Sequence, residues 1–201
     1  MRRSATRFLV ICAAVFPMVL NAQATGMPSF NSPYPAFQRS EFGVETSFPN
    51  QAGTAFEAVY RYSAGRLDIG LRGGMWDPGV CCRTEMLIGA EARERVITHT
   101  TAFPLDGALV LGAGGAIVSG ASVVFIPVGV SFGRKIEPST TTVTIVPYVQ
   151  PTATVVGDHG TTVDFTLGFG ADFRLSRAFD ARVSFGLGDL NGISIGATWI
   201  H

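Results

Sequence analysis

Hydrophobic and polar residues alternate along much of this chain, most regularly from Thr161 to Leu175. Every second residue from Val163 to Leu175 is apolar, and the residues between them are aspartate, threonine, glycine or arginine. Successive side chains of a β-strand point to opposite faces of the sheet, so a period of two predicts a strand. One face of this strand suits a hydrophobic environment, and the other suits a small polar interior.

Segments with the same alternation follow one another from about residue 39 to the C-terminus, separated by turn-forming residues. The sequence therefore predicts an all-β, antiparallel up-and-down barrel of ten strands, or of eight if the first pair or the proline-broken seventh is irregular. The expected strands cover residues 41–48, 56–62, 66–72, 85–93, 106–118, 122–133, 141–155, 161–175, 179–188 and 193–199. This order places the tight turns at 63–65 and 176–178 at the same end as the C-terminus, the periplasmic side of a bacterial membrane barrel.

The uncharged stretch from Gly107 to Gly133 is also long enough for a membrane-spanning helix. It contains seven glycines, Pro127 and a Ser119-Gly120 break, and many of its other residues are β-branched. These features favour strands over a helix. We therefore expect two strands that turn at 119–121.

The N-terminus has the three parts of a secretory signal peptide. Arg2, Arg3 and Arg7 precede an apolar stretch at residues 8–20, and Ala22-Gln23-Ala24 follows. The apolar stretch is too short to span a membrane, because a helix needs about 20 residues. We expect residues 1–24 to be a signal peptide that is removed after Ala24.

Residues 25–38 contain Pro28, Pro33 and Pro35 together with serine and asparagine. This composition is typical of a linker or a partly extended lead-in, so we expect the segment to lie outside the core. One β-barrel domain follows at 39–201.

Charged residues make up 15% of the chain, against roughly 25% in a typical soluble domain, and they lie on the strand faces opposite the large apolar side chains. A soluble barrel would carry them on its outer surface, whereas a membrane barrel would point them inward. Almost every base is arginine, which suits bidentate pairing with carboxylates, and glycines share the same face, as expected in a narrow interior. We therefore predict a charge network inside the barrel that contains Glu57, Arg61, Asp68, Arg72, Glu91, Arg93, Asp164, Asp172, Arg174 and Arg182. With Glu85, Asp180, Arg66, Arg83 and Arg95 on the same faces, seven acidic and eight basic side chains are close to balance.

In pattern and layout, residues 39–201 resemble the small outer-membrane β-barrels of the OmpA/OmpX type. The resemblance implies a barrel in the outer membrane of a Gram-negative-type bacterium, in contact with outer-membrane lipid, and we expect a monomer. Barrels of this family commonly have eight strands and end in an aromatic residue, whereas here Trp199 lies two residues before the end.

One motif in the sequence suggests catalysis. Residues 129–133 match G-x-S-x-G, but they lie within an expected strand instead of the sharp strand-to-helix turn that exposes a catalytic serine. His99, His159 and His201 are scattered and lack a metal-binding spacing. We therefore expect no enzymatic activity, no cofactor and no metal.

The mature chain contains two adjacent cysteines, Cys81 and Cys82, without the C-x-x-C spacing of a redox or zinc site. We expect two thiols at the edge of a loop. The chain has a single lysine, Lys135, and no basic patch, so we expect no nucleic-acid partner.

The main hypothesis is a non-enzymatic outer-membrane barrel with a filled polar interior and a structural or surface-interaction role, whose ligand is unknown. A second hypothesis is a lipid-binding or lipid-modifying barrel. Pro127 and Pro147 fall on neighbouring expected strands, and a proline cannot donate to the hydrogen-bond ladder, so the pair could mark a weak seam for an acyl chain. The third hypothesis is a secreted soluble β-barrel that holds an apolar ligand inside its phenylalanine face.

Overall fold

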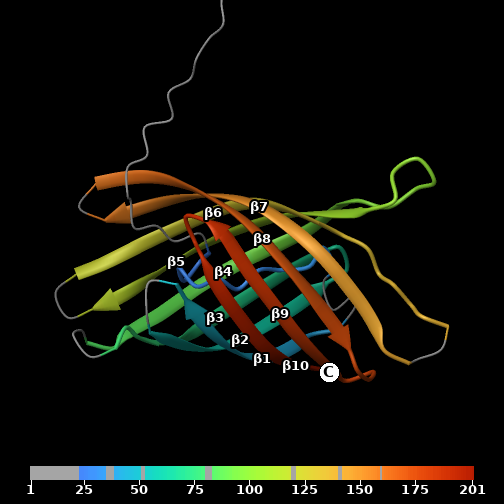
Figure 1. The fold of residues 1–201 in the computed structure, drawn as a ribbon, viewed down its shortest axis with the longest axis horizontal. Helices are drawn as coiled ribbons and strands as arrows, with labels where there is room; N and C mark the ends of the chain where they lie inside the picture. The colour runs from blue at the N-terminus through green and yellow to red at the C-terminus, as the bar shows by residue number, and fades with distance from the viewer. Residues whose placement is uncertain are drawn as a thin grey trace, which may run out of the picture.

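The alternating segments form a closed antiparallel barrel of ten strands in the computed structural model, which describes residues 23–34, 39–50, 53–79, 83–118, 121–139, 142–158 and 160–201 (Figure 1). The strands are β1 (Glu41–Pro49), β2 (Thr54–Ala64), β3 (Leu67–Asp77), β4 (Glu85–Ile97), β5 (Asp106–Val118), β6 (Ala121–Gly133), β7 (Thr144–Asp158), β8 (Gly160–Arg174), β9 (Phe179–Gly188) and β10 (Gly192–Ile200). The prediction of a ten-stranded all-β barrel is confirmed, and the eight-strand alternative is wrong.

Each strand pairs with its neighbours in the sequence, and β1 closes the barrel against β10. The closing register runs from Glu41 opposite Ile200 to Pro49 opposite Gly192. Closure leaves no strand edge with unpaired backbone groups, which removes the usual site of edge-to-edge aggregation.

The barrel has two ends, which we name by the position of the chain termini. The terminal end is where β1 begins and β10 ends, and the far end is the opposite one. The short turns after β2 and β8 lie at the terminal end, as the sequence predicts. The longer connections 98–105 and 134–143 lie there too, so this end carries both short and long connections.

The uncharged stretch from Gly107 to Gly133 forms β5 and β6, which pair antiparallel with each other. Among the described residues, no helix is long and apolar enough to cross a membrane. The prediction of two strands in this stretch is therefore confirmed.

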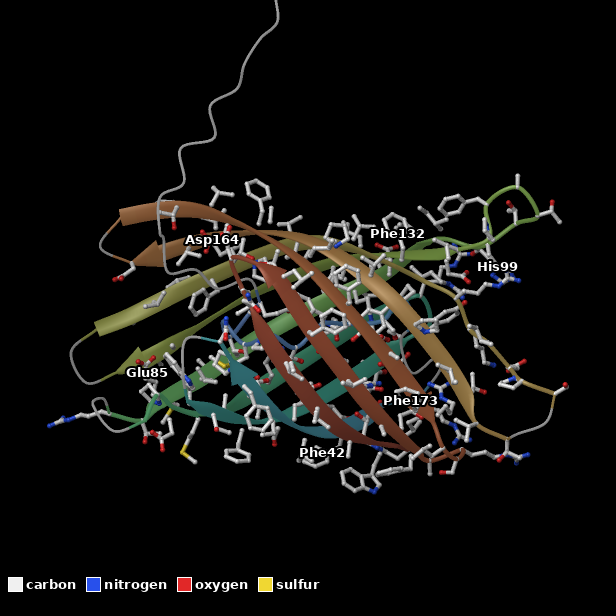
Figure 2. All side chains as sticks on the ribbon, viewed as in Figure 1. Phe42, Glu85, His99, Phe132, Asp164 and Phe173 are labelled. Carbon is white, nitrogen blue, oxygen red and sulfur yellow. The ribbon has the colours of Figure 1, made fainter. Side chains whose placement is uncertain are left out.

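The two faces of the barrel differ sharply in chemistry. Thirty large hydrophobic side chains are exposed on the described residues, including Phe165 at 66% and Leu71 at 62%. The alternate positions of the same strands are buried and carry mostly charged, hydroxyl or glycine residues. Figure 2 shows Phe42 projecting from the outer surface, with Glu85 and His99 near opposite ends of the barrel. The barrel is thus apolar outside and polar inside.

Residues 23–34, which we call the inner segment, lie inside the barrel (Figure 1). All twelve are buried, with Met27 packed near the far end and Tyr34 near the terminal end. The prediction that the lead-in stays outside the core is therefore wrong for residues 25–34. Its prolines do prevent it from joining the sheet, but the lumen supplies polar partners for an extended chain that belongs to no strand. Residues 35–38 lie outside the described residues.

Candidate functional site: the filled lumen

Asn31 lies at the centre of the contacts between the inner segment and the barrel. Arg61 donates to its side-chain oxygen at 2.6 Å, and its amide nitrogen donates to Glu91 at 3.1 Å. Its backbone N–H donates to Gln150 at 2.9 Å, and Ser131 donates to its carbonyl at 2.6 Å. These partners come from β2, β4, β7 and β6, so one residue ties the inner segment to four strands.

Around Asn31, arginines and carboxylates form a continuous network. Arg61 donates to Glu41 at 2.7 Å and, through Nε, to Glu91 at 2.8 Å. Arg182 donates to both oxygens of Glu41, at 2.9 and 2.7 Å, and its Nε lies 3.7 Å from Asp172. Buried charges are stable only when paired and hydrogen-bonded, and here β1, β2, β4, β8 and β9 share one set of such pairs.

A second group of contacts holds Ser29. Its hydroxyl donates to Glu45, and Arg72 donates to the Ser29 hydroxyl at 3.0 Å and to Glu45 at 2.6 Å. The Nε of Arg72 also lies 3.5 Å from Glu57. A single arginine therefore lies between two carboxylates at this level of the lumen.

Ser32 joins a third group nearer the terminal end. Its hydroxyl donates to Asp172 at 2.6 Å, while Arg93 donates to its carbonyl at 2.7 Å. Arg93 also donates to Asp68 at 2.8 Å. Each arginine of the lumen thus bonds to a barrel carboxylate, and Arg61, Arg72 and Arg93 bond to the inner segment as well.

Phe30 is the largest apolar contact of the inner segment. It packs with Tyr148 and Leu190, and the Tyr148 hydroxyl donates to its carbonyl at 2.8 Å. A Cβ atom placed on Gly168 would lie 2.2 Å from the Phe30 ring, and one on Gly186 would lie 3.2 Å from it. The glycines on the inward face of β8 and β9 therefore leave the space that Phe30 fills.

Tyr34 anchors the other end of the inner segment. Its hydroxyl donates to Asp106 and accepts from the backbone N–H of Lys135 at 3.1 Å. Burial and the hydrogen bond to Asp106 raise the pKa of Tyr34 to about 12, so the phenol keeps its proton and remains a donor. His99, half-exposed, contacts the same carboxylate through Nδ1 at 2.7 Å.

The structure places the predicted charge residues on the inward side of the barrel, where ion pairs join Arg61 to Glu91, Arg72 to Glu57, Arg93 to Asp68 and Arg182 to Asp172. Eight of the predicted residues are buried: Glu57, Arg61, Asp68, Arg72, Glu91, Arg93, Asp164 and Asp172. The side chain of Arg182 is 10% exposed, and that of Arg174 is 29% exposed and paired with Asp180 at 3.0 Å. Arg66 and Arg83, by contrast, are exposed, and Glu85 and Arg95 are partly exposed near the ends of β4.

Sequence reasoning missed three acidic residues of the lumen. Glu41 and Glu45 lie on the inward face of β1, and Asp106 begins β5. The alternation of Glu41 and Glu45 with Phe42 and Val44 was the signal that could have found the first two. With them, nine acidic side chains are buried among the described residues.

The serine, histidines and cysteines considered for catalysis or metal binding do not form a common site among the described residues. Ser131 of the G-x-S-x-G match is buried within β6 and bonded to the inner segment, as a strand residue. His99 and His201 lie at the terminal end, whereas His159, Cys81 and Cys82 lie outside the described residues. Over the described ranges, no group of three or more His, Cys, Asp or Glu side chains is arranged to hold a metal ion.

The proline seam lies elsewhere than expected. The pairing of β6 with β7 ends at Gly133 opposite Tyr148, one residue before Pro147. Pro147 therefore interrupts no hydrogen-bond pair between these two strands. The pairing of β5 with β6 skips Ile126 and Pro127, and that of β6 with β7 skips Gln150 and Pro151. Next to the second gap, the outer surface has an apolar hollow of about 530 Å³ lined mainly by β6, β7 and β8.

No protein-family model matches this chain, and no curated protein matches it. Solved structures similar to it include a de novo designed transmembrane β-barrel, with 16% identity over 82% of this chain and 97% of the design, at a TM-score of 0.40. A bacterial polysaccharide outer-membrane secretin shares 13% identity over 74% of this chain, which spans 56% of the secretin, at a TM-score of 0.45. The β-domain of the Bordetella autotransporter BrkA shares 12% identity over 81% of this chain and 97% of that domain, at a TM-score of 0.44.

Proposed function

We propose that this protein is a monomeric barrel of the bacterial outer membrane, closed by its own inner segment, with a structural or surface-interaction role and no enzymatic activity. The observation that carries the proposal is the reversed distribution of polarity, apolar outside and charged inside. Soluble monomers rarely expose contiguous apolar patches larger than a few hundred Å². An apolar surface around the whole barrel needs lipid as its solvent.

Strand lengths and aromatic residues support a membrane-spanning position. A tilted strand of about 9–11 residues crosses the hydrocarbon core, and the strands here have 9 to 15. Across the terminal end, Tyr60, Phe42, Trp199 and Phe179 are register neighbours on β2, β1, β10 and β9. Trp199 and Phe179 meet edge to face at 5.3 Å. A row of aromatic side chains at one level is typical of the membrane–water interface.

The same polarity disfavours a secreted soluble barrel with an apolar ligand inside. Such a barrel needs its phenylalanine face inside, whereas Phe56 and Phe165 are 60% and 66% exposed. The inner segment and the charge network occupy the interior instead.

Cell fractionation and refolding test the proposal. We expect the protein in the outer-membrane fraction, extracted only by detergent, and we expect purified chain to fold only with micelles or vesicles present. A water-soluble folded monomer formed without either would contradict the membrane assignment.

A lipid-binding role is the second candidate, because one observation favours it. The apolar hollow beside the Pro151 gap is bordered by Val128, Phe165, Leu167 and Leu187, a shape that suits an acyl chain. Ala153 lies in the hollow, so Ala153→Phe should fill it. We expect this variant to lose a lipid that copurifies with the parent barrel in native mass spectrometry. Equal lipid retention by both proteins would rule out the hollow as a binding site.

A further inference from the structure

Glu57 is a buried carboxylate that lacks well-placed hydrogen-bond donors in the lumen. It lies on the inward face of β2 and is 4% exposed, and neither of its oxygens accepts a hydrogen bond of normal geometry. The nearest cationic atom is Nε of Arg72 at 3.5 Å, but that arginine already bonds to Glu45 and Ser29 through Nη2. Burying a charge is costly unless it is paired and hydrogen-bonded, so the site favours another cation.

Thr25, the third residue of the inner segment, lies beside this carboxylate. The Thr25 side chain interacts with Glu57, and Thr25 is fully buried with a hydroxyl that has no hydrogen-bond partner of normal geometry. Within one residue, the α-nitrogen and the hydroxyl oxygen are separated by three covalent bonds. A charge on the Thr25 nitrogen would therefore lie close to Glu57.

The sequence supplies a way to create that charge. The signal-peptidase motif Ala22-Gln23-Ala24 ends immediately before Thr25. Hydrolysis of the Ala24–Thr25 peptide bond consumes one water and leaves a carboxylate on Ala24 and an amine on Thr25, which takes up a proton. Removal of Ala24 also frees the space above Gly89 and Gly112, where water can hydrate the new ammonium group.

We propose that the lumen contains a binding site for the processed N-terminus, in which the Thr25 α-ammonium pairs with Glu57. The inference rests on the proposed export to the outer membrane, because it needs the signal peptide to be removed. Processing then adds a cation beside a buried carboxylate whose oxygens accept no hydrogen bond of normal geometry, and it fixes the first residue of the mature inner segment.

The chain allows a selective test, because Lys135 is its only lysine. In a mature chain carrying Lys135→Arg, the α-amine is the only primary amine that an acetylating reagent can modify. We would acetylate this chain unfolded, refold it in detergent micelles and compare its Tm with that of the unmodified chain. We expect acetylation to lower the Tm by about 4 °C or more. The same acetylation should leave the Tm of a Glu57→Gln chain unchanged, because the partner carboxylate is gone.

Asp180→Asn is the matched control, since Asp180 is also a buried lumen carboxylate but pairs with Arg174 at the terminal end. Acetylation should lower the Tm of this control as much as that of its parent. An equal decrease in the Glu57→Gln chain, or no decrease in the parent, would overturn the proposal. So would a first residue other than Thr25 in protein purified from membranes.

A second measurement covers the case in which Glu57→Gln does not fold. In the parent, the buried α-amine should react with the reagent at least about tenfold more slowly in the folded barrel than in the unfolded chain. Equal rates would overturn the proposal. A failure of the membrane assignment would look different, because the parent chain itself would then fold without micelles.

Discussion

At the scale of single residues, glycine decides how much room the lumen has. Gly168 faces the Phe30 ring so closely that Gly168→Ala should force the inner segment to shift. We expect a loss of about 1–3 kcal/mol in the free energy of unfolding, the usual cost of overpacking. Denaturant unfolding in micelles measures it, with Gly160→Ala as the control because nothing lies within 4 Å of its added Cβ. If both variants are equally stable, Phe30 does not occupy this space.

Asn31 makes the opposite kind of contribution, through hydrogen bonds instead of shape. Asn31→Ala removes the amide that accepts from Arg61 and donates to Glu91, and leaves both charged groups with an unsatisfied site. We expect a destabilisation of about 2–4 kcal/mol, because buried charged groups lose more than neutral ones when a partner is removed. Urea unfolding of the parent, Asn31→Ala, Arg61→Ala and the double variant gives the coupling free energy between the two side chains. Additive losses would show that the two side chains do not interact.

On the outer face, Phe169 stacks on Phe185 with ring centroids 5.1 Å apart. Phe169→Arg should destabilise the barrel by about 2–4 kcal/mol, because an arginine near the midplane must leave water for lipid. Folding into lipid vesicles of defined thickness measures the loss. Gly160→Arg, at the end of the same sheet, is the control and should have little effect. A stable Phe169→Arg barrel would place this surface in water.

At the scale of elements, the strands were predictable and the inner segment was not. A strand between lipid and lumen must alternate, so a period of two marks each strand without any knowledge of its partners. Residues 23–34 carry no such period, because they contact the barrel through Ser29, Asn31 and Ser32 and not through a ladder. Their position depends on groups from nine different strands, β1 to β9, which no local pattern reports.

The proline gaps give a prediction at this scale. The ladder between β5 and β6 lacks pairs where residues 112–113 face 126–127, and the ladder between β6 and β7 lacks pairs where residues 130–131 face 150–151. Each gap contains a proline, Pro127 or Pro151, which has no N–H to donate. Amides next to these gaps should exchange with deuterium faster than those of Val163–Phe173, whose ladder to β7 is continuous. Hydrogen exchange in micelles measures this. Uniform protection across all three regions would mean that the gaps do not weaken the barrel.

At the scale of the whole molecule, we expect the inner segment to determine whether an open pore runs through the barrel. An eight-stranded barrel is filled by its own side chains, and ten strands make the interior only slightly wider. Here the extra width is filled by the inner segment, which starts at Thr25 in the processed chain and runs from the Met27 cluster near the far end to Tyr34 near the terminal end. Parent protein should therefore show no steady conductance in planar bilayers.

Removing the contacts of the inner segment should open a path for ions. We would replace residues 27–34 by a glycine–serine sequence of equal length. This variant loses the packing of Phe30 and the hydrogen bonds of the Asn31 and Tyr34 side chains. The exposed lumen would then hold water around Glu41, Glu91 and their neighbours, where acidic side chains are in excess. We expect small, cation-selective currents, because a negative lumen attracts cations. Retained heat resistance of the folded form on gels would show that the variant barrel is intact. An intact variant that stays as silent as the parent would mean that strand side chains alone close the lumen.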